Sequence, residues 1–241
     1  KSMVRAIATS LDVPVPEETY FSPEDQAATI PSELPALLKP NFGDSSIGIT
    51  QDAVVYTPQQ LIAYIDKLRD ELPGIPVLIQ EYLTGKEYSI GILGNPQLTC
   101  HIMPVLEVDY SGLDPDLPKI LGYESKWDPD SAYWTQIKYK EAEIDEDNRR
   151  KLMDWSVLLF ERLGCRDYAR FDFRADANGV IKLLEVNPNP GWCWDGKMNF
   201  MAGFEDMRYA DFLKKILEAG LEREALKARE MSEVRVTGGC E

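Results

Sequence analysis

The sequence predicts an α+β fold, and three patterns support this prediction. Apolar residues recur at helical spacing in several segments, two apolar runs of strand length occupy 77–83 and 87–93, and a hairpin pattern spans 169–187. The chain has 241 residues, of which 44% are hydrophobic. It is therefore long enough to bury a core as one large domain or two small ones.

Composition and charge exclude several classes of protein. Lys and Arg number 26 against 41 Asp and Glu, and the net charge of −15 repels nucleic acid and anionic lipid. No apolar run approaches the roughly 20 residues of a membrane-spanning helix, which predicts a cytoplasmic protein without a membrane partner. The cysteines lack CxxC spacing and predict free thiols, without structural zinc or a disulfide scaffold. They are Cys100, Cys165, Cys193 and Cys240.

The chain begins at Lys1, without an initiator methionine, and runs at once into a helical pattern. This beginning indicates a fragment, or a protein whose front domain is missing. Prolines at 14 and 16 end the first helix, and the apolar run at 34–40 predicts a short buried strand. Thr-Pro-Gln-Gln at 57–60 matches the capping box of a second helix.

Later in the chain, the segment 109–139 is polar and aromatic and shows no clear period, which is typical of a functional or mobile loop. Asp145 predicts the start of a helix that Gly164 closes. A final helix carries the apolar positions of 209–217. Beyond Gly220 the charged sequence predicts a solvated or frayed tail.

The hairpin has a register that can be worked out. We interpret Asn178-Gly179 as a type I′ turn, so that the two residues that flank it face each other. Continuing this pairing places Asp172 opposite Glu185, and Arg170 opposite Asn187, on one face of the sheet.

Two carboxylates that face each other across a sheet, with Cβ atoms about 5 Å apart, repel each other unless a cation lies between them. Asp172 and Glu185 therefore indicate a metal site, and Asn187 adds a neutral oxygen. Such a set of oxygen ligands suits Mg²⁺, which keeps waters and takes further ligands from phosphates. The alternative is an exposed acidic sheet face.

The loop from Gly43 to Gly48 offers backbone N–H groups and the hydroxyls of Ser45 and Ser46, and Lys39 comes just before it. Such a loop suits phosphate binding. It matches neither a P-loop nor G-x-G-x-x-G, so the alternative is an ordinary turn. His101, the single histidine, has no evident partner for nucleophilic chemistry and is interpreted as a core or surface residue.

Four motifs occur in a characteristic order. They are Lys39-Pro40 with the Gly43–Gly48 loop, Ile79-Gln80-Glu81-Tyr82-Leu83-Thr84-Gly85-Lys86-Glu87, Arg170-Phe171-Asp172, and Leu184-Glu185-Val186-Asn187-Pro188-Asn189-Pro190-Gly191. Together they resemble the ATP-grasp enzymes, most closely the D-alanine–D-alanine ligase branch. The resemblance runs from Lys1 to about Leu217 and covers the central and C-terminal domains of that branch, with its N-terminal domain missing.

The resemblance implies a role for each matching residue. Lys1 and Lys39 would contact ATP phosphates, Gln80, Glu81, Tyr82 and Leu83 would line the adenine slot, and Glu87 would hold the ribose hydroxyls. Asp172, Glu185 and Asn187 would bind Mg²⁺, with Mn²⁺ as a substitute. Lys126 would reach the transferred phosphate from a mobile lid, and Arg170 with the N–H of Gly191 would stabilise an oxyanion. Ser45 and Ser46 match the retained loop serines.

The implied fold is an ATP-grasp fold, in which two subdomains, 1–86 and 87–220, enclose ATP and a charged tail follows at 221–241. The implied reaction joins a small carboxylate to an amine through an acyl phosphate. Two alternatives are a nucleotide-binding protein without catalysis and an ATP-grasp carboxylating enzyme. The resemblance is compatible with a homodimer.

One segment departs from the branch. Residues 192–198, after Pro190-Gly191, read Trp-Cys-Trp-Asp-Gly-Lys-Met, where the branch has small residues and a serine-leucine pair. Trp127 also replaces a tyrosine of the branch. We therefore expect a substrate other than a pair of D-alanines, contacted by a set of four residues, unless the tryptophans merely pack the loop. That set is Trp192, Trp194, Asp195 and Lys197.

Overall fold

The computed structural model describes residues 1–25, 34–43 and 45–237, with side chains as far as Arg229. The chain forms two compact units, each assembled from three stretches. The first unit contains Lys1–Glu87, Val108–Lys138 and Phe173–Leu184, and the second contains Tyr88–Glu107, Tyr139–Asp172 and Glu185–Glu241. The predicted boundary between residues 86 and 87 stays a prediction.

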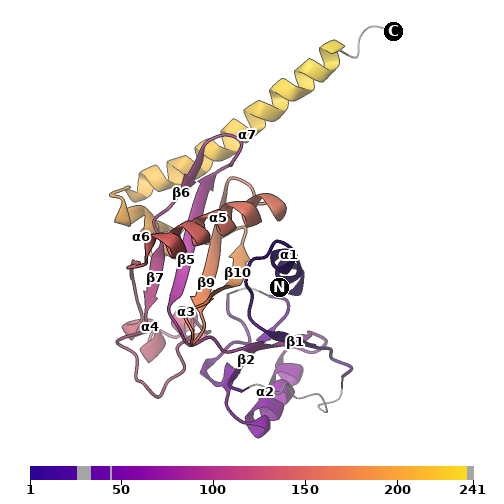
Figure 1. Ribbon diagram of the computed structural model, residues 1–241, viewed down its shortest axis with the longest axis vertical. Coiled ribbons are helices and arrows are strands. Elements are labelled where there is room, and N and C mark those ends of the chain that lie inside the picture. The colour runs from indigo at the N-terminus through magenta and orange to yellow at the C-terminus, as the bar shows by residue number, and fades with distance from the viewer. Residues whose placement is uncertain (26–33, 44, 238–241) are drawn as a thin grey trace. The chain divides into compact units, whose positions relative to one another are not determined.

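The first unit contains a four-stranded antiparallel sheet with the strand order β1-β4-β2-β3. Helix α2 packs beside this sheet and contacts β2 and β3 (Figure 1). Side chains from α2 and the strands, among them Leu61, Ile65, Leu38 and Ile79, form one buried cluster. The strands are β1 (Glu18–Phe21), β2 (Ala36–Pro40), β3 (Val54–Val55) and β4 (Val77–Glu81), and the helices are α1 (Ser2–Ser10), η1 (Gln51–Ala53) and α2 (Pro58–Glu71).

The capping box predicted for the second helix is confirmed. The Thr57 side chain accepts the N–H of Gln60, the Gln60 side chain accepts the N–H of Thr57, and Pro58 occupies the first turn. These bonds satisfy N–H groups that have no partner inside the helix. The short buried strand at 34–40 is also confirmed as β2.

A second sheet has the strand order β10-β9-β5-β7-β8, with β6 paired to β5. Its strands are β5 (Glu87–Gly94), β6 (Cys100–Ile102), β7 (Leu106–Asp109), β8 (Lys138–Glu141), β9 (Tyr168–Ala175) and β10 (Ile181–Asn187). Between β7 and β8 lie two short helices, α3 (Glu124–Trp127) and α4 (Ala132–Gln136). They occupy the segment in which the sequence showed no clear period.

The hairpin turn between β9 and β10 differs from the predicted type I′ turn. Asp176 pairs with Val180 through a 2.9 Å backbone hydrogen bond, so the loop has three residues, and only its last, Gly179, lies at positive φ (+83°). The Asp176 carboxylate explains this turn, because it accepts the N–H groups of Asn178 and Val180. The predicted pairing of Ala177 with Val180 at the turn is therefore wrong, whereas the pairing of Asp172 with Glu185 farther along the strands stays a prediction.

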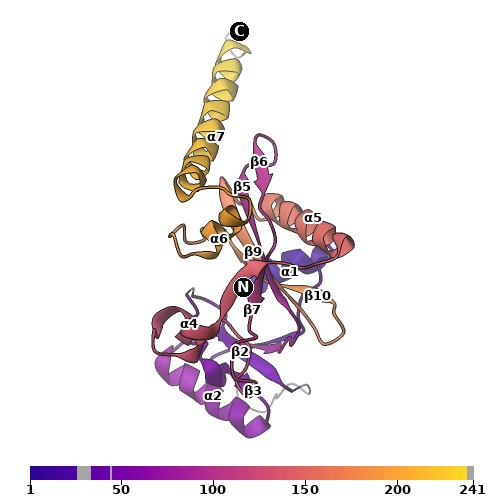
Figure 2. The ribbon, with the colours of Figure 1, turned by 90° about the vertical axis from the view of Figure 1, so that its left-hand side faces the viewer.

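Three helices belong to the second unit: α5 (Glu146–Arg162), α6 (Lys197–Phe204) and α7 (Tyr209–Thr237). Asp145 caps α5 as predicted, and Gly164 follows it at positive φ. The prediction of a frayed tail is wrong as far as Thr237, because α7 continues through Gly220 as one helix (Figure 2). Residues 238–241 lie outside the described residues.

Arg223 explains why the helix continues. Its guanidinium pairs with the Asp167 carboxylate at 2.9 Å, and Asn95 donates to the same carboxylate. These contacts, in the second unit, anchor the part of α7 beyond Gly220. Within the described residues, no helix is long and apolar enough to cross a membrane. Cys100, Cys165 and Cys193 are free thiols as predicted, and Cys240 lies outside the described residues.

Candidate functional site

Strands β2 and β4 of the first unit hold a buried polar pair. Lys39, on β2, donates from Nζ to Oε1 of Gln80 at 2.9 Å, and both residues are buried. Gln80, on β4, donates in turn to the Glu18 carboxylate on β1. A lysine buried to 7% exposure is rare unless it is paired. The sheet therefore holds the Lys39 ammonium at a defined position.

The adjoining stretch after β4 is held by a second set of polar contacts. The Lys182 ammonium lies 2.8 Å from the Glu81 carboxylate and 3.4 Å from that of Asp176. The hydroxyl of Tyr82 accepts the N–H of Lys119 at 2.8 Å, and burial raises the pKa of this hydroxyl. Leu83 is buried. These contacts fix the positions of Glu81 and Tyr82, two of the residues predicted to line the adenine slot.

Glu87, at the start of β5, lies in a buried cluster of three polar side chains. The Tyr110 hydroxyl donates to its carboxylate at 2.7 Å, and Nη1 of Arg174 lies 3.5 Å away. The Arg174 guanidinium also stacks over the rings of Tyr82 and Tyr110. A charged acceptor held in place by an arginine and a phenol is suited to receive hydroxyl donors from a ligand.

The loop after Pro40 is strongly curved. Gly43, Ser45, Ser46 and Gly48 all have positive φ. The side-chain Nζ of Lys1 donates to the carbonyl of Gly43 in the loop and to the carbonyl of Pro40 just before it. Non-glycine residues at positive φ, such as the adjacent Ser45 and Ser46, are uncommon and often occur at functional sites, so the loop remains a candidate phosphate site. Asp44 lies outside the described residues.

Side chains of the segment between β7 and β8 contact this loop. The Trp127 indole N–H donates to the carbonyl of Ser45 at 3.1 Å, and the Ser46 hydroxyl donates to the carbonyl of Leu121 at 2.9 Å. Lys126 lies on α3 next to Trp127, with an exposed side chain. The segment predicted to be a lid and the Gly43–Gly48 loop are thus in contact within the first unit.

The second unit has a buried ionic cluster centred on Asp172 of β9. Arg170 donates from Nε and Nη2 to both carboxylate oxygens at 2.9–3.1 Å, and Ser89 of β5 donates to Oδ1. Nζ of Lys197 lies 3.0 Å from Oγ of Ser89 and 3.3 Å from Oδ1 of Asp172. Burial opposes the charge of Asp172, but Arg170 and then Lys197 outweigh it and hold the pKa of the carboxyl below its usual range.

Glu185 and Asn187, on β10, are more accessible. Glu185 is exposed, and it contributes, after Asp172, to raising the pKa of Arg170 against the effect of burial. Oδ1 of Asn187 accepts one hydrogen bond, from the N–H of Asn189, which leaves its second lone pair. These two oxygens fit a Mg²⁺ ion. Asp172 does not fit as found, because both of its oxygens already accept hydrogen bonds from cationic groups.

The segment that departs from the resemblance lies between β10 and α6. Gly191, Trp192 and Trp194 are exposed, and the Trp192 ring meets Tyr168 edge-on at 6.3 Å. Asp195 is exposed and lies beside the Cys193 thiol. Lys197, which was predicted to contact the substrate, instead binds Asp172, and its side chain is 10% exposed.

The Cys193 thiol should be alkylated slowly by iodoacetamide at neutral pH. Partial burial, and next Asp195, raise the pKa of this thiol, and only the thiolate reacts. Asp195→Asn should therefore speed alkylation of the Cys193 peptide, as followed by mass spectrometry. Cys100 serves as the control in the same digest, because its pKa is raised by burial and Glu161. Equal Cys193 rates in the two proteins would contradict this contact.

Comparison with known proteins identifies the family. The family model described as the D-ala D-ala ligase C-terminus matches residues 14–218. The chain belongs to this family. A relative from Haemophilus influenzae, named D-alanine--D-alanine ligase, is 26% identical over 207 residues, which cover 86% of this chain and 63% of the relative. The chain therefore spans less than two thirds of that relative.

Comparison with solved structures agrees with an ATP-grasp fold. The Bacillus anthracis D-alanine--D-alanine ligase complexed with ATP superposes with a TM-score of 0.72 at 18% identity, covering 94% of this chain and 67% of that one. The VanG D-Ala:D-Ser ligase of Enterococcus faecalis gives 0.66 at 23% identity, covering 91% and 60%. The predicted fold class is confirmed.

Three further side chains contact predicted site residues but were not predicted from the sequence. Ser89 and Tyr110 each bind a predicted site carboxylate, and Arg174 pairs with Glu87. Strand alternation places Ser89 two residues after Glu87 on the same side of β5, so the period of two was the available signal. Arg174 likewise follows Asp172 by two residues. Tyr110 carried no comparable signal.

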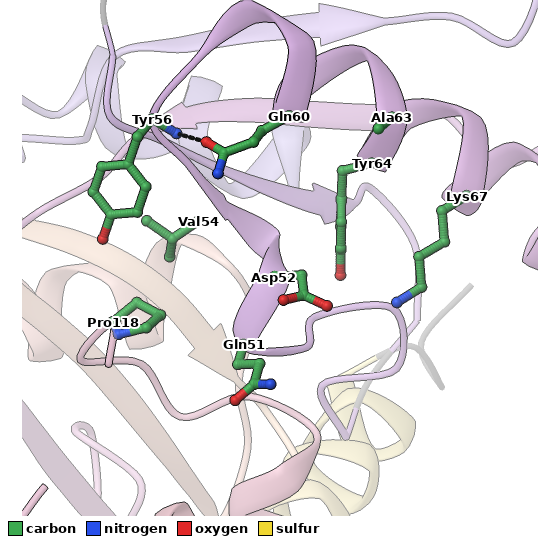
Figure 3. A pocket seen from close by; sticks show the side chains of 9 residues that line it. All are labelled: Gln51, Asp52, Val54, Tyr56, Gln60, Ala63, Tyr64, Lys67 and Pro118. Atoms are coloured by element: carbon green, nitrogen blue, oxygen red, sulfur yellow. Dashed lines mark hydrogen bonds between the residues drawn. The ribbon is translucent and has the colours of Figure 1, made fainter. Parts of the chain in front are cut away.

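A pocket of about 440 Å³ opens beside α2 in the first unit of this family member. Figure 3 shows Tyr56, Gln60 and Tyr64 on one side and Pro118 facing them. Its other lining residues are Gln51, Asp52, Val54, Ala63 and Lys67. None of the residues predicted for the site lines this pocket, and we assign it no role.

Proposed function

We propose that this chain carries the nucleotide-binding and catalytic part of an ATP- and Mg²⁺-dependent carboxylate–amine ligase, acting on a substrate other than a pair of D-alanines. Membership of the D-ala D-ala ligase C-terminus family carries the proposal. The buried pairs around Lys39 and Glu87, and the cluster around Asp172, support it, because each keeps a charged group ready for a ligand or for a reacting centre.

The reaction has two steps. A carboxylate oxygen of the first substrate attacks the γ-phosphorus of ATP, and the bond to ADP breaks, which gives an acyl phosphate. The amine nitrogen of the second substrate then attacks the carbonyl carbon. The resulting tetrahedral intermediate expels phosphate as the nitrogen loses a proton. Phosphate is a far better leaving group than the oxide ion of a free carboxylate, which is why ATP is required.

We assign ATP to the polar groups of the first unit. Lys39 and Lys1 would neutralise phosphate charge, with Lys126 as a third cation from the lid. Glu81 to Leu83 would line the adenine, together with Gln80, and the Glu87 carboxylate would accept the ribose hydroxyls. The support is geometric: Glu87 is buried, charged and held by Tyr110 and Arg174. Ser45 and Ser46 would add donors from the curved loop.

We assign the metal to Glu185 and Asn187, whose oxygens fit Mg²⁺. When bound, the ion would neutralise phosphate charge during transfer. Arg170 uses Nε and Nη2 on Asp172, so the donors of Nη1, with the N–H of Gly191, are the ones proposed for the oxyanion. Arginine suits this task because it stays charged at any physiological pH.

The substrate proposal rests on the segment 192–195. Two exposed indoles, Trp192 and Trp194, suit a larger or flatter substrate, and Asp195 suits an amine. A structural neighbour named as a D-Ala:D-Ser ligase indicates that neighbours of this fold take different second amino acids. Lys197 is withdrawn from the substrate set, because its ammonium is held by Asp172 and Ser89.

Two measurements test the proposed function. Calorimetry on this chain with a non-hydrolysable ATP analogue and Mg²⁺ should show binding, and absence of binding would contradict the ATP site. The full-length protein should release phosphate from ATP only when amino acids are present. A panel of amino acids, with the mass of each reaction product measured, should reveal a better substrate than D-alanine. Efficient D-alanyl-D-alanine synthesis without a better substrate would remove the substrate proposal. Nucleotide binding without any phosphate release that depends on added amino acids would favour a nucleotide-binding protein without catalysis.

Glu185→Ala should lower the affinity for the ATP analogue in the presence of Mg²⁺ by roughly tenfold, about 1.4 kcal/mol, because the ion loses its charged protein ligand. Affinity measured in EDTA should not change. Glu143→Ala, which also removes an exposed glutamate of the second unit, is the matched control. Unchanged Mg²⁺-dependent affinity in the Glu185 variant would show that the metal binds elsewhere.

The segment 109–139 should become resistant to limited proteolysis when the ATP analogue binds, because a lid that contacts phosphate through Lys126 would be held over it. Cleavage sites are read by mass spectrometry with and without the analogue. Cleavage within α7 provides the internal reference. Equal cleavage of the segment in both states would show that it does not act as a lid.

A further inference from the structure

We infer that the Lys197 ammonium supplies the positive charge at Asp172, so that the nucleotide complex takes one divalent cation, bound by Glu185 and Asn187, and none on Asp172. The inference deepens the proposed function and rests on it. It starts from a disagreement: Asp172 was predicted to be a metal ligand, but its carboxylate is fully engaged by groups of the protein itself.

The hydrogen bonds to Asp172 show how fully it is engaged. A carboxylate has about four lone-pair positions. Oδ1 accepts from Nε of Arg170, from the Ser89 hydroxyl and from Nζ of Lys197, while Oδ2 accepts from Nε and Nη2 of Arg170. A Mg²⁺ ion bound at about 2.1 Å from either oxygen would have to displace one of these donors and then lie beside two positive charges.

The position of Lys197 in the sequence strengthens this inference. It is the first residue of α6, where the helix dipole disfavours a positive charge, and α6 has no acidic residue in its first turn. A lysine in this place is therefore unfavourable on local grounds alone. The contact with Asp172 and Ser89 compensates for that cost and gives the lysine a definite function.

The next residue fixes α6 against β5. Met198 is completely buried, and its Sδ lies close above Gly91, where an added Cβ would come within 2.9 Å of it. A side chain at position 91 would push the methionine side chains of Met103 and Met198 away, so glycine favours this close approach. Because Gly91 lies two residues after Ser89 on the same strand, the contact places Lys197 next to Ser89 and Asp172. The ammonium is therefore held there by packing as well as by charge.

Counting bound Mn²⁺ tests the inference directly. Free Mn²⁺ is measured by its electron paramagnetic resonance signal while the wild-type chain, saturated with a non-hydrolysable ATP analogue, is titrated. We expect one Mn²⁺ per nucleotide-bound chain. Two ions would overturn the inference, because the lysine would then yield its place to a metal. Absence of analogue binding would overturn the proposed function as well, so the two failures differ.

Lys197→Met removes the charge but keeps a chain of similar length, and Asp172 keeps Arg170 and Ser89 as partners. We expect this variant to bind a second Mn²⁺, and Lys197→Arg to bind one, like the wild type. An unchanged count of one in Lys197→Met would overturn the inference, because the lysine would not be what excludes the ion. Lys197→Gln replaces it if the methionine variant does not fold. Lys214→Met, at an exposed lysine paired with Glu218, is the control.

Discussion

Replacing Asp172 with asparagine should lower the free energy of unfolding by about 3–5 kcal/mol, the loss typical when one partner of a buried ion pair is removed. The variant leaves the charges of Arg170 and Lys197 buried without their counterion. Denaturant unfolding monitored by circular dichroism measures the change. Asp211→Asn is the matched control, because Asp211 pairs with Arg208 at the surface, and exposed pairs contribute about 0–1 kcal/mol.

The loss should depend on pH in a definite direction. The pKa of Asp172 is held below its usual range in the folded protein, because the charges of Arg170 and Lys197 outweigh the effect of burial. Its contribution to stability is therefore complete above the unfolded pKa of about 3.9 and is lost as the pH falls towards the folded pKa. The difference between wild type and Asp172→Asn should be constant from pH 7 to pH 5 and shrink below pH 4. A constant difference down to pH 3 would show that charge is not its cause.

Lys39→Met should weaken binding of the ATP analogue by about 10- to 100-fold, which corresponds to about 1.5–3 kcal/mol for hydrogen bonds to a charged group. The ammonium is buried and held by Gln80, so its charge acts on a bound phosphate with little screening by water. Methionine keeps most of the chain length in the core. Calorimetry measures the affinity.

Lys67→Met is the matched control for this variant. Lys67 belongs to the same unit, but its ammonium lies over the Tyr64 ring at the surface of α2. Its replacement should leave nucleotide affinity within about twofold of wild type, a free-energy change of about 0.4 kcal/mol. Equal losses in the two variants would mean that Lys39 acts only through the overall charge of the protein.

Local signals in the sequence were sufficient for much of the fold. The capping box at 57–60 and the cap at Asp145 were found because each depends on side chains within one turn of a helix. The hairpin lies where the pattern predicts it, but its turn differs from the predicted one because the Asp176 carboxylate accepts two N–H groups of the loop. Asparagine-glycine therefore favours a turn without determining its length.

The site was harder to predict, since its partners come from distant parts of the chain. The pair of Lys39 and Gln80 depends on the register of β2 and β4, which no local pattern gives. The contact between Lys197 and Asp172 depends on where α6 packs, and that is decided by Met198 and Gly91. The continuation of α7 past Gly220 similarly depends on Asp167, more than fifty residues earlier.

The pairing of Arg223 with Asp167 determines where a shortened form of this protein can end. Asp167 immediately precedes β9, the strand that carries Arg170 and Asp172. Its carboxylate also accepts a hydrogen bond from the Asn95 side chain. The part of α7 beyond Gly220 therefore holds the start of that strand in place, even though it lies beyond the family match that ends at residue 218. A recombinant fragment that ends at the family boundary would lose this contact. One that ends after Arg229 keeps it and gives an outlying helix end for a tag or a surface linkage.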